Sequence, residues 1–440
     1  MNKSIKTTFF LALILFFSVS CKSDKSEYEQ PNIIYILADD LGYGELGSFG
    51  QTEIETPNID RLAEEGMIFT DHYSGSPVCA PARSVLMTGM HTGTSPIRDN
   101  SEWGERGDVW SFKSMLDNPE LEGQRPLPDS TVTVAQVLKN NGYKTGMVGK
   151  WGLGAPHTNS IPTKKGFDFF YGYNCQRIAH SYYPTHLWKN EEREYLDNYL
   201  VEKKEHLDKG ADIYNLDSYA KYNQNDYAPT LMHKEALNFI DENKNEKFFL
   251  YYASLIPHLA LQAPKRWEEY YRNKFGKEEP YIGRQYYPAL TPKATYAAMI
   301  SYLDEQVGEV VEKLKEIGKY ENTLIIFTSD NGGHNPSKAN NGPLRDGKQS
   351  VYEGGLKVPT VICWKGKIKE NSISNKTLMS MDLFSTILEI AGSKSHAKTD
   401  GISFVDELFN PNNKEALDNK DKTDDPKPPK DPSSIVIKSS

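Results

Sequence analysis

The chain has 440 residues, which is long enough for one large α/β domain, alone or with a smaller appendage. Its 51 Lys and Arg stand against 60 Asp and Glu, giving a net charge of -9. That acidic balance argues against a general nucleic-acid-binding protein, so no nucleic-acid partner is expected. Any anionic substrate needs a local basic pocket rather than an overall positive field.

The first residues have the pattern of an export signal. Two lysines precede the apolar run 9–17, which is too short to span a bilayer as a helix of the mature protein. Small residues then lead into Cys21 and resemble a bacterial lipoprotein site, although Ser18 stands where that pattern prefers Leu. We expect a signal peptide over 1–21, lipidation of Cys21 and a tether over 22–30, which place the protein on a bacterial membrane, at the periplasmic face or cell surface. The alternative is an ordinary signal peptide with an incidental cysteine.

The first apolar run after this tether is NIIYILA, residues 32–38, which has the composition of a buried strand. It delivers Asp39 and Asp40 at its carboxyl end. The following stretch, TPNIDRLAEEG, predicts a helix with Thr56 as its N-cap, a proline at the first helical position and Gly66 as its stop.

Three later units repeat this order of helix and apolar strand. Their strands lead to Lys150, to His258 and to the pair Asp330 and Asn331, and the longest helical pattern covers 296–318. Wholly apolar strands that alternate with helices predict an α/β fold with a parallel sheet covered on both faces. Functional sites in such folds form at the carboxyl ends of the strands, which is where these polar residues fall.

The segment 152–226 is rich in Tyr, Asn and His and has little regular periodicity. We expect a long insertion over the active face that sets specificity. Its Arg177, His180 and His186 are candidate substrate-binding residues, because such side chains bond hydroxyls and anionic groups. His334, just after the last strand, is a further candidate for the pocket.

The end of the chain differs in composition. Residues 410–440 form a Lys, Asp and Pro run with almost nothing to bury, and this predicts a disordered or aberrant tail beyond a catalytic domain over 31–409. Cys175 and Cys363 are far apart in sequence; export would allow them to pair, but buried free thiols are favoured.

The two acidic pairs predict a metal site. Asp39, Asp40, Asp330 and Asn331 supply hard oxygen ligands at strand ends, which favours calcium over magnesium. Zinc is disfavoured because the pairs bring no histidine or thiolate at ligand spacing. Taken alone, each pair is also compatible with ordinary turn or cap chemistry.

Four basic or titratable side chains reach the same edge of the predicted sheet: Arg83, Lys150, His258 and Lys348. Each alone is compatible with a solvated surface residue. Their arrival beside the carboxylates makes them candidate catalytic residues.

Six motifs make the pattern specific. CAPAR, residues 79–83, has the form Cys-x-Pro-x-Arg, and it occurs with ADDLGYGELG, TPNIDRLAEEG, VGKWGLG, TSDNGG and GKQSVYEGGLKVP. In these motifs and their order, over roughly residues 30 to 405, the chain resembles a type I sulfatase of the alkaline phosphatase-like superfamily, and bacterial glycan sulfatases in particular. The resemblance implies a mixed, mostly parallel sheet flanked by helices, and it implies a C-terminal antiparallel subdomain that we expect to be truncated here, since nothing after 409 has its alternating pattern.

The resemblance also implies the chemistry of Cys79. In the family this cysteine is oxidised to Cα-formylglycine (3-oxoalanine) by a formylglycine-generating or radical maturase. One hydroxyl of the hydrated aldehyde attacks sulfur, and the other later expels sulfate as the aldehyde re-forms. Hydrolysis of sulfate esters is therefore the activity that the resemblance implies.

By motif match, each candidate receives a role. Asp39, Asp40, Asp330 and Asn331 correspond to the calcium ligands, and modified Cys79 completes the set. Arg83 holds the aldehyde hydrate, Lys150 and Lys348 neutralise the sulfate oxygens, and His258 with Lys348 protonates the leaving alcohol.

One position departs from the family pattern. Many members have a histidine two residues after the central lysine, where it aids regeneration of the aldehyde, and this chain has Gly152. Either His180 or His186 substitutes, or regeneration relies on another base.

The aromatic-rich insertion favours a sulfated carbohydrate as substrate, with galactose or N-acetylgalactosamine sulfates as first choice. Two alternatives remain at this point. One is a phosphodiesterase or phosphonate hydrolase of the same superfamily, and the other is an inactive lipoprotein that binds sulfated glycans.

Overall fold

The computed structural model describes residues 30–202, 206–395 and 397–409. The signal peptide, the lipidated cysteine, nearly all of the tether and the C-terminal tail predicted from the sequence lie outside these residues. Among the helices that the structure describes, none combines the length and apolarity that a bilayer crossing requires.

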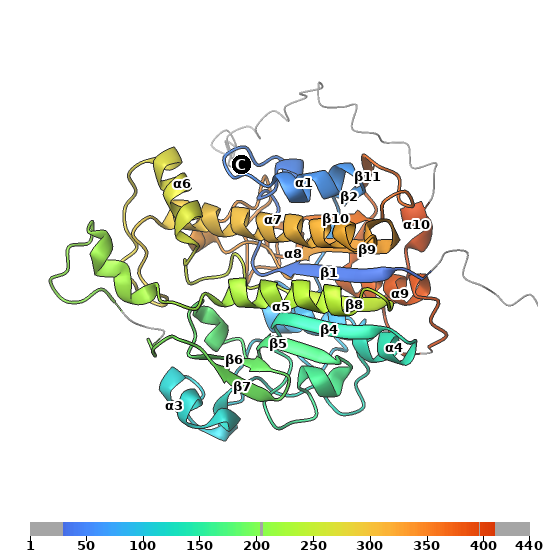
Figure 1. Cartoon of the computed structure of the whole chain (residues 1–440), viewed down its shortest axis with the longest axis horizontal. Helices are drawn as coiled ribbons and strands as arrows, with labels where there is room; N and C mark the ends of the chain where they lie inside the picture. The colour runs from blue at the N-terminus through green and yellow to red at the C-terminus, as the bar shows by residue number, and fades with distance from the viewer. Residues whose placement is uncertain (1–29, 203–205, 396, 410–440) are drawn as a thin grey trace, which may run out of the picture.

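A large sheet forms the centre of the molecule (Figure 1). Its ten described strands are, in order across the sheet, β11 (Ser372–Ser374), β2 (Met67–Phe69), β10 (Thr360–Cys363), β9 (Thr323–Ser329), β1 (Asn32–Ala38), β8 (Phe248–Ala253), β4 (Lys144–Lys150), β5 (Phe169–Tyr173), β6 (His186–Lys189) and β7 (Glu192–Tyr195). The five central strands, from β9 to β5, are parallel, whereas β10, β6 and β7 pair antiparallel. The predicted mixed, mostly parallel sheet is confirmed.

Helices cover both faces of this sheet. One face carries α1 (Pro57–Glu64), α5 (Ala228–Glu242) and α7 (Pro292–Glu316), with α6 (Lys265–Phe275) packed on α7, and the other carries α2 (Cys79–Thr88), α4 (Val134–Asn140) and α9 (Ser380–Ile390). The remaining helices are α3 (Phe112–Asp117), α8 (Glu353–Leu356) and α10 (Val405–Phe409), and β3 (His72–Tyr73) pairs with β12 (Leu378–Met379) in a small second sheet. Short 3-10 helices lie at Gly47–Phe49, Gly104–Arg106, Pro119–Leu121, Pro162–Lys165, Ile178–His180, Leu216–Tyr222, Tyr320–Asn322 and Asn335–Ser337.

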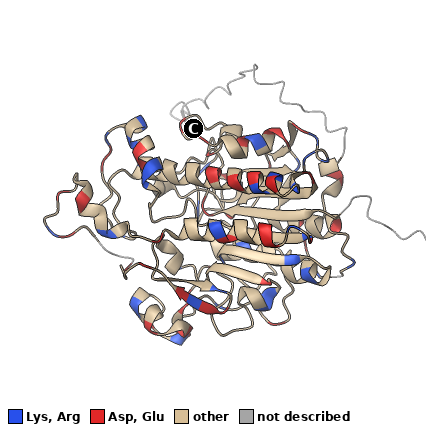
Figure 2. Ribbon diagram, viewed as in Figure 1, with Lys and Arg blue, Asp and Glu red and all other residues tan. Residues whose placement is uncertain are grey.

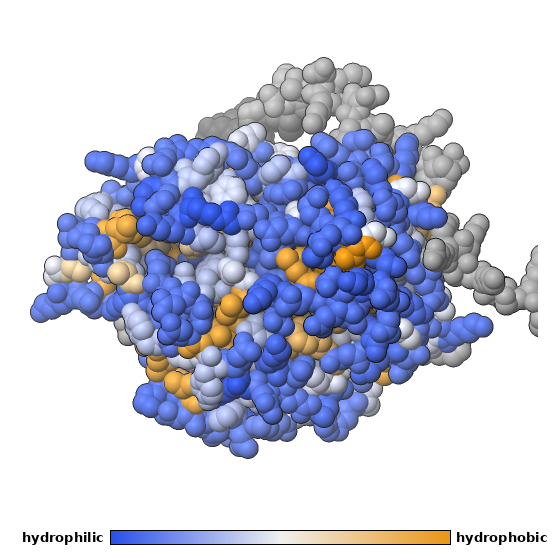
Figure 3. Space-filling view, in the orientation of Figure 1, coloured by the Kyte–Doolittle hydropathy of each residue, from blue (hydrophilic) through white to orange (hydrophobic). Residues whose placement is uncertain are grey.

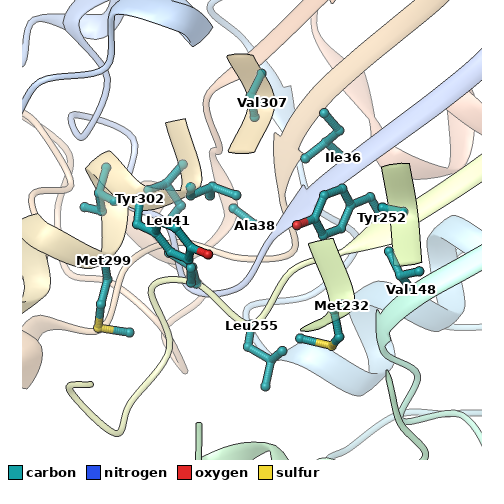
Figure 4. Packing of buried hydrophobic residues seen from close by; sticks show 14 of the residues in the cluster. Ile36, Ala38, Leu41, Val148, Met232, Tyr252, Leu255, Met299, Tyr302 and Val307 are labelled. Carbon is teal, nitrogen blue, oxygen red and sulfur yellow. The ribbon is translucent and has the colours of Figure 1, made fainter. Parts of the chain in front are cut away.

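The central strand β1 shows why its run is apolar throughout. Successive side chains of a strand point to opposite faces, and both faces are covered here. Ile34 and Ile36 pack in the core under α1, α5 and α7, where Figure 4 shows Ile36 near Tyr252 and Val307. Ile33 and its alternate neighbours pack in the core under α2, α4 and α9. The ribbons of α5 and α7 carry many residues coloured as charged in Figure 2, in contrast to β1.

The start of α1 is stabilised from a distance. Thr56 occupies the predicted N-cap position, but its side chain makes no cap hydrogen bond. Asp304 of α7 caps the helix instead. Its carboxylate accepts hydrogen bonds from the backbone N–H of Asn58, at 3.0 and 3.1 Å, and from the backbone N–H of Ile59, at 2.8 Å. The side-chain amide of Asn58 adds a bond of 2.8 Å. A carboxylate at a helix N-terminus also interacts favourably with the helix dipole.

The prediction of one long irregular insertion over 152–226 is wrong for the middle of this segment, where three strands occur. Within residues 169–195, β5, β6 and β7 extend the sheet by three strands, whereas the loop from 174 to 185 between β5 and β6 brings His180 to the ring of His258. Residues 196–202 and 206–222 belong to the arm at the left of Figure 1, and Tyr219 and Tyr222 of this arm pack against Ala260 and Tyr287 in a small separate cluster. The arm therefore supports the loop that precedes α7.

The cysteines of the described residues form no disulfide. Cys79, Cys175 and Cys363 are buried and free among the described residues, which confirms the preference for free thiols at the last two.

The face drawn in Figure 3 is mainly hydrophilic, with small, separate hydrophobic areas.

Candidate active site

The predicted site residues meet at the carboxyl edge of the parallel strands. Asp39 and Asp40 follow β1, Asp330 and Asn331 follow the neighbouring β9, and Lys150 is the last residue of β4. Asp40 has a positive φ of 64°, so the extended backbone, and with it the alternation of side chains between the two faces of the sheet, ends at this residue. All five residues are buried.

Four side chains form a candidate metal site. Asp39, Asp40, Cys79 and His258 each place one possible ligand atom within 4.8 Å of the others. Cys79, the first residue of α2, has its Sγ 3.4 Å from Oδ1 of Asp39 and 3.8 Å from Oδ1 of Asp40.

Asn331 completes the acceptor set. Its Nδ2 donates to Oδ1 of Asp40 at 2.8 Å, whereas its Oδ1 is buried and accepts no hydrogen bond. A buried acceptor without a partner is costly unless something binds it. The carboxylate and amide oxygens of Asp39, Asp40 and Asn331 suit a hard divalent cation such as calcium, whereas Cys79 and His258 bring to the same group a thiol and an imidazole that the acidic pairs alone do not supply and that zinc also binds.

Positive charges enclose this group of carboxylates. Arg83 donates to Oδ2 of Asp330 through Nε at 3.1 Å and Nη2 at 2.9 Å, and through Nη1 to the carbonyl of Lys150 at 2.6 Å. The Lys150 ammonium pairs with Asp39. Lys348 lies 2.8 Å from Oδ2 of Asp40 and 3.3 Å from the Cys79 sulfur. The site therefore neutralises its own buried charges, as such groups require.

The electrostatics differ between the groups. Burial raises the pKa of Asp39, but Lys150 and then His258 and Arg83 outweigh it, so the pKa lies below its ordinary value. Burial, with a smaller contribution from Asp39, raises the pKa of the Cys79 thiol well above its usual range. An unmodified Cys79 stays protonated at neutral pH and is a poor nucleophile.

His258 is held by neighbours on both sides. Its Nδ1 lies 2.5 Å from the carbonyl of Leu259, which places the hydrogen on that nitrogen and leaves Nε2, 3.6 Å from Asp40, as the nitrogen that faces the cluster. Burial, reinforced by Lys348, lowers the pKa of His258 to about 3. His180 stacks parallel on its ring at 4.9 Å and 3°, and Tyr286 meets the His258 ring edge-on at 6.1 Å.

Of the remaining substrate-binding candidates, His334 and His180 lie beside the cluster, whereas the guanidinium of Arg177 is held by other side chains. His334 lines a cavity of about 590 Å³ that Tyr286 also lines, so it and His180 lie beside the cluster. Arg177 stacks on the ring of Trp110 at 3.5 Å and lies 3.4 Å from Glu102, so its guanidinium is already engaged.

His186 lies elsewhere, and its predicted role is corrected. Its ring is buried on β6, where Nε2 lies 3.0 Å from Glu122 and Nδ1 lies 3.1 Å from the hydroxyl of Thr185. Trp188 and Arg193 donate to the same Glu122 carboxylate, at 2.6 and 2.9 Å. Both nitrogens of His186 are thus used within a buried structural network.

The space beside Gly152 is occupied by neither predicted histidine. A Cβ built on Gly152, whose φ is +71°, would lie 2.0 Å from Nε2 and 2.8 Å from Cδ of Gln176. Gln176 is buried, and its Nε2 has no hydrogen-bond partner among the described residues. The side chain nearest to Gly152 is therefore a hydrogen-bond donor and no base.

Sequence reasoning missed three side chains at or near the site. Gln176 fills the space beside Gly152, Tyr286 packs against His258, and the side-chain oxygen of Asn100 accepts from the backbone N–H of Ala80 at 2.7 Å, in the first turn of α2. None of them stands in a motif or at a strand end, so no local signal in the sequence would have found them.

Comparisons with known proteins agree with this geometry. A family model described as Sulfatase matches residues 31–393. The chain is 30% identical over 396 residues to N-acetylgalactosamine-6-sulfatase of Homo sapiens, covering 87% of this chain and 66% of that protein. It is 32% identical over 369 residues to Arylsulfatase J of Mus musculus, covering 82% and 52%. The chain thus spans less than two thirds of the length of these curated relatives.

Solved structures also match. The crystal structure of Ps i-CgsB in complex with k-i-k-neocarrahexaose has a TM-score of 0.65 and 30% sequence identity, and the match covers 84% of this chain and 75% of that one. A phosphonate monoester hydrolase of Agrobacterium radiobacter matches at 20% identity and a TM-score of 0.55, which is a likeness of fold alone.

Proposed function

The chain belongs to the sulfatase family, and from this membership we propose that it hydrolyses sulfate esters of carbohydrates at the cluster around Cys79. The observation that carries the proposal is the convergence of two acidic strand ends, three cationic side chains and Cys79 in one buried cluster. A carbohydrate substrate is supported by the relatives named N-acetylgalactosamine-6-sulfatase and by the neighbour solved with a neocarrahexaose. We take galactose and N-acetylgalactosamine sulfates as the first candidates.

Membership of the family implies two further chemical groups, a calcium ion and a formylglycine at position 79, and residues described above would hold them. Asp39 and Asp40, which belong to the candidate metal group, would hold calcium together with Asp330 and Asn331, and the buried Oδ1 of Asn331, which has no hydrogen-bond partner among the described residues, supports this. When present, calcium supplies Lewis-acid stabilisation of negative charge, and formylglycine at Cys79 supplies a hydroxyl nucleophile in its hydrated form.

The chain's own residues orient the reaction. Arg83 is fixed between Asp330 and the carbonyl of Lys150, so it gives the first turn of α2 a rigid position. Lys348 lies 3.3 Å from the Cys79 sulfur, and with Lys150 it brings positive charge to where sulfate oxygens would gather. Such preorganised charge in a buried site stabilises a transition state more than it would in water.

Lys348, whose ammonium stays protonated beside Asp40, is the proposed proton donor to the departing alcohol, and His258, which is neutral and unprotonated at Nε2, is its proposed partner in that transfer. The Nε2 of His258 faces the cluster, and its ring is held between the carbonyl of Leu259 and the stacked ring of His180. The alcohol then leaves on the side of Tyr286 and His334, where the neighbouring cavity begins.

We also propose that the protein matures by oxidation of Cys79 and is exported and lipid-anchored at Cys21, a residue outside those described. The anchor would bring the site to sulfated polysaccharides outside the cytoplasm.

The test uses the full chain made in a host that converts such cysteines to formylglycine. Sulfate released from galactose 6-sulfate and N-acetylgalactosamine 6-sulfate is measured by ion chromatography, in parallel with aryl sulfate and aryl phosphate turnover, and Cys79→Ala serves as the blank. A mass spectrum of the Cys79 peptide establishes that maturation occurred. Faster turnover of the aryl phosphate, or no sulfate release by matured protein from any of these esters, would reject the proposal.

A further inference from the structure

The cavity of about 590 Å³ beside the active cluster has walls from three parts of the chain. Leu259 and Leu261 follow His258, residues 279–286 belong to the loop before α7, and residues 334–338 follow β9. Because Tyr286 contacts the rings of His180 and His258 edge-on, the cavity begins where the leaving alcohol of the proposed reaction would lie. Its size is typical of small-molecule sites and exceeds what one sulfate group needs.

The walls suit a sugar. Apolar side chains of Leu259, Leu261 and Pro280 alternate with Tyr281, Tyr286 and the amide of Gln285. A mixture of apolar and aromatic surface with a few polar groups is the usual composition of a ligand pocket.

Two cations on these walls lack partners. Arg284 and Lys338 are exposed, and within the residues that the structure describes neither side chain makes a hydrogen bond or an ion pair. The nearby helix α6 gives the contrast, because all four of its basic residues pair with carboxylates. The acidic residue on the wall, Glu279, accepts a hydrogen bond from the hydroxyl of Tyr214 at 3.1 Å.

These charges matter because the whole chain has a net charge of -9 and repels polyanions on average. Lys150 and Lys348 already face the carboxylates of the cluster, so they serve the sulfate that reacts. Arg284 and Lys338 lie farther out, on walls that a neighbouring sugar unit would contact.

We propose that this cavity binds a second anionic group of the glycan, a sulfate or a carboxylate on the sugar next to the one that is desulfated, through Arg284 and Lys338. The inference rests on the proposed sulfatase function and extends it: the preferred substrates are glycans that carry two or more negative charges on adjacent units.

The test compares three disaccharides that share one galactose 6-sulfate unit. The neighbouring sugar is neutral in the first, sulfated in the second and carries a carboxylate in the third. The matured wild type is compared with Arg284→Gln/Lys338→Gln and with Lys277→Gln, an exposed lysine in the same loop that does not line the cavity. Binding of the same disaccharides to the Cys79→Ala chain is measured by calorimetry, which needs no turnover.

Exposed ion pairs are individually weak, so we expect the wild type to prefer a dianionic disaccharide roughly 5- to 20-fold in kcat/KM and in affinity. The preference should shrink at high salt and fall to within about 2-fold in the double variant, while Lys277→Gln keeps it. A preference in the sulfated arm, the carboxylate arm or both supports the proposal and identifies the group.

Equal kcat/KM and equal affinity for neutral and anionic neighbours in the wild type would overturn the proposal, as would a preference that survives the double variant. Failure of the sulfatase function gives a different result. In that case no disaccharide releases sulfate, yet charge-dependent binding to the Cys79→Ala chain persists and still supports the second anion site.

Discussion

Replacing Gly152 by alanine should destabilise the protein mainly through Gln176. The added Cβ would lie 2.0 Å from Nε2 and 2.8 Å from Cδ of that side chain, far closer than non-bonded atoms approach. Gln176 is 4% exposed, so it has little room to move aside. The φ of +71° adds a second cost, since residues with a Cβ rarely adopt that conformation.

The two costs can be separated. A left-handed conformation costs an alanine about 1–2 kcal/mol relative to glycine. Displacing a buried side chain in a packed interior adds about 1–3 kcal/mol. Gly152→Ala should therefore lower the free energy of unfolding by about 2–5 kcal/mol. In a Gln176→Ala background only the backbone cost of about 1–2 kcal/mol should remain.

The assay is urea unfolding followed by circular dichroism for the wild type, Gly152→Ala, Gln176→Ala and the double variant. Gly318→Ala is the matched control, because Gly318 has a φ of +64° and nothing within 4 Å of its built Cβ. It should show the backbone cost alone. Costs of the two substitutions that add within about 0.5 kcal/mol would refute the reasoning, because contacting residues are expected to couple.

Four other changes have definite expected outcomes. Asp304→Ala removes the carboxylate that accepts from the first turn of α1 and should lower the free energy of unfolding by about 2–4 kcal/mol in the same urea assay; an effect below about 0.5 kcal/mol would contradict that role. Cys79→Ser, in a host that oxidises only cysteine, should release at most one equivalent of the alcohol per chain and no free sulfate, because a single hydroxyl accepts the sulfate group without a means to expel it; multiple turnovers would exclude the mechanism. Calcium at about 100 times its dissociation constant should stabilise the wild type by about 2.7 kcal/mol in thermal unfolding, and Asn331→Ala should reduce this shift; no response of the wild type would remove the metal assignment. Cys21→Ala should move the protein from the membrane fraction to the soluble fraction, and retention in the membrane would argue against the lipid anchor.

The sequence predicted those parts of the fold that depend on local composition. Residues 32–38 are apolar throughout because both faces of β1 are covered, and the strand has the predicted bounds. The helix after Thr56 begins where proline and the N-cap pattern place it. The bond acceptor for its first turn is Asp304, which is more than 240 residues away, and no local pattern can indicate such a contact.

The candidate site likewise contains residues that the sequence predicts and residues that only the folded structure reveals. Asp39 and Asp330 are predicted because they stand at strand ends, which the topology of a parallel sheet brings to one edge, whereas Cys79 is predicted from the Cys-x-Pro-x-Arg motif. Gln176 and Tyr286 reach the site through the packing of long loops, which depends on the whole fold. His186 has the same residue type and neighbourhood in sequence as a sugar ligand, and only the buried carboxylate of Glu122 reveals its structural role.

The burial of Cys79 restricts when an enzyme can reach this cysteine. Its side chain is 1% exposed, and its sulfur lies between the carboxylates and the ammonium group of Lys348. An enzyme that oxidises this cysteine cannot reach it in the folded chain without opening the first turn of α2 and the ion pairs around it. If the protein matures as proposed, oxidation comes before folding, on the newly made chain, and a molecule that folds first keeps its thiol. On the same proposal, the rate of folding and the supply of the maturing enzyme together set the fraction of chains that carry formylglycine.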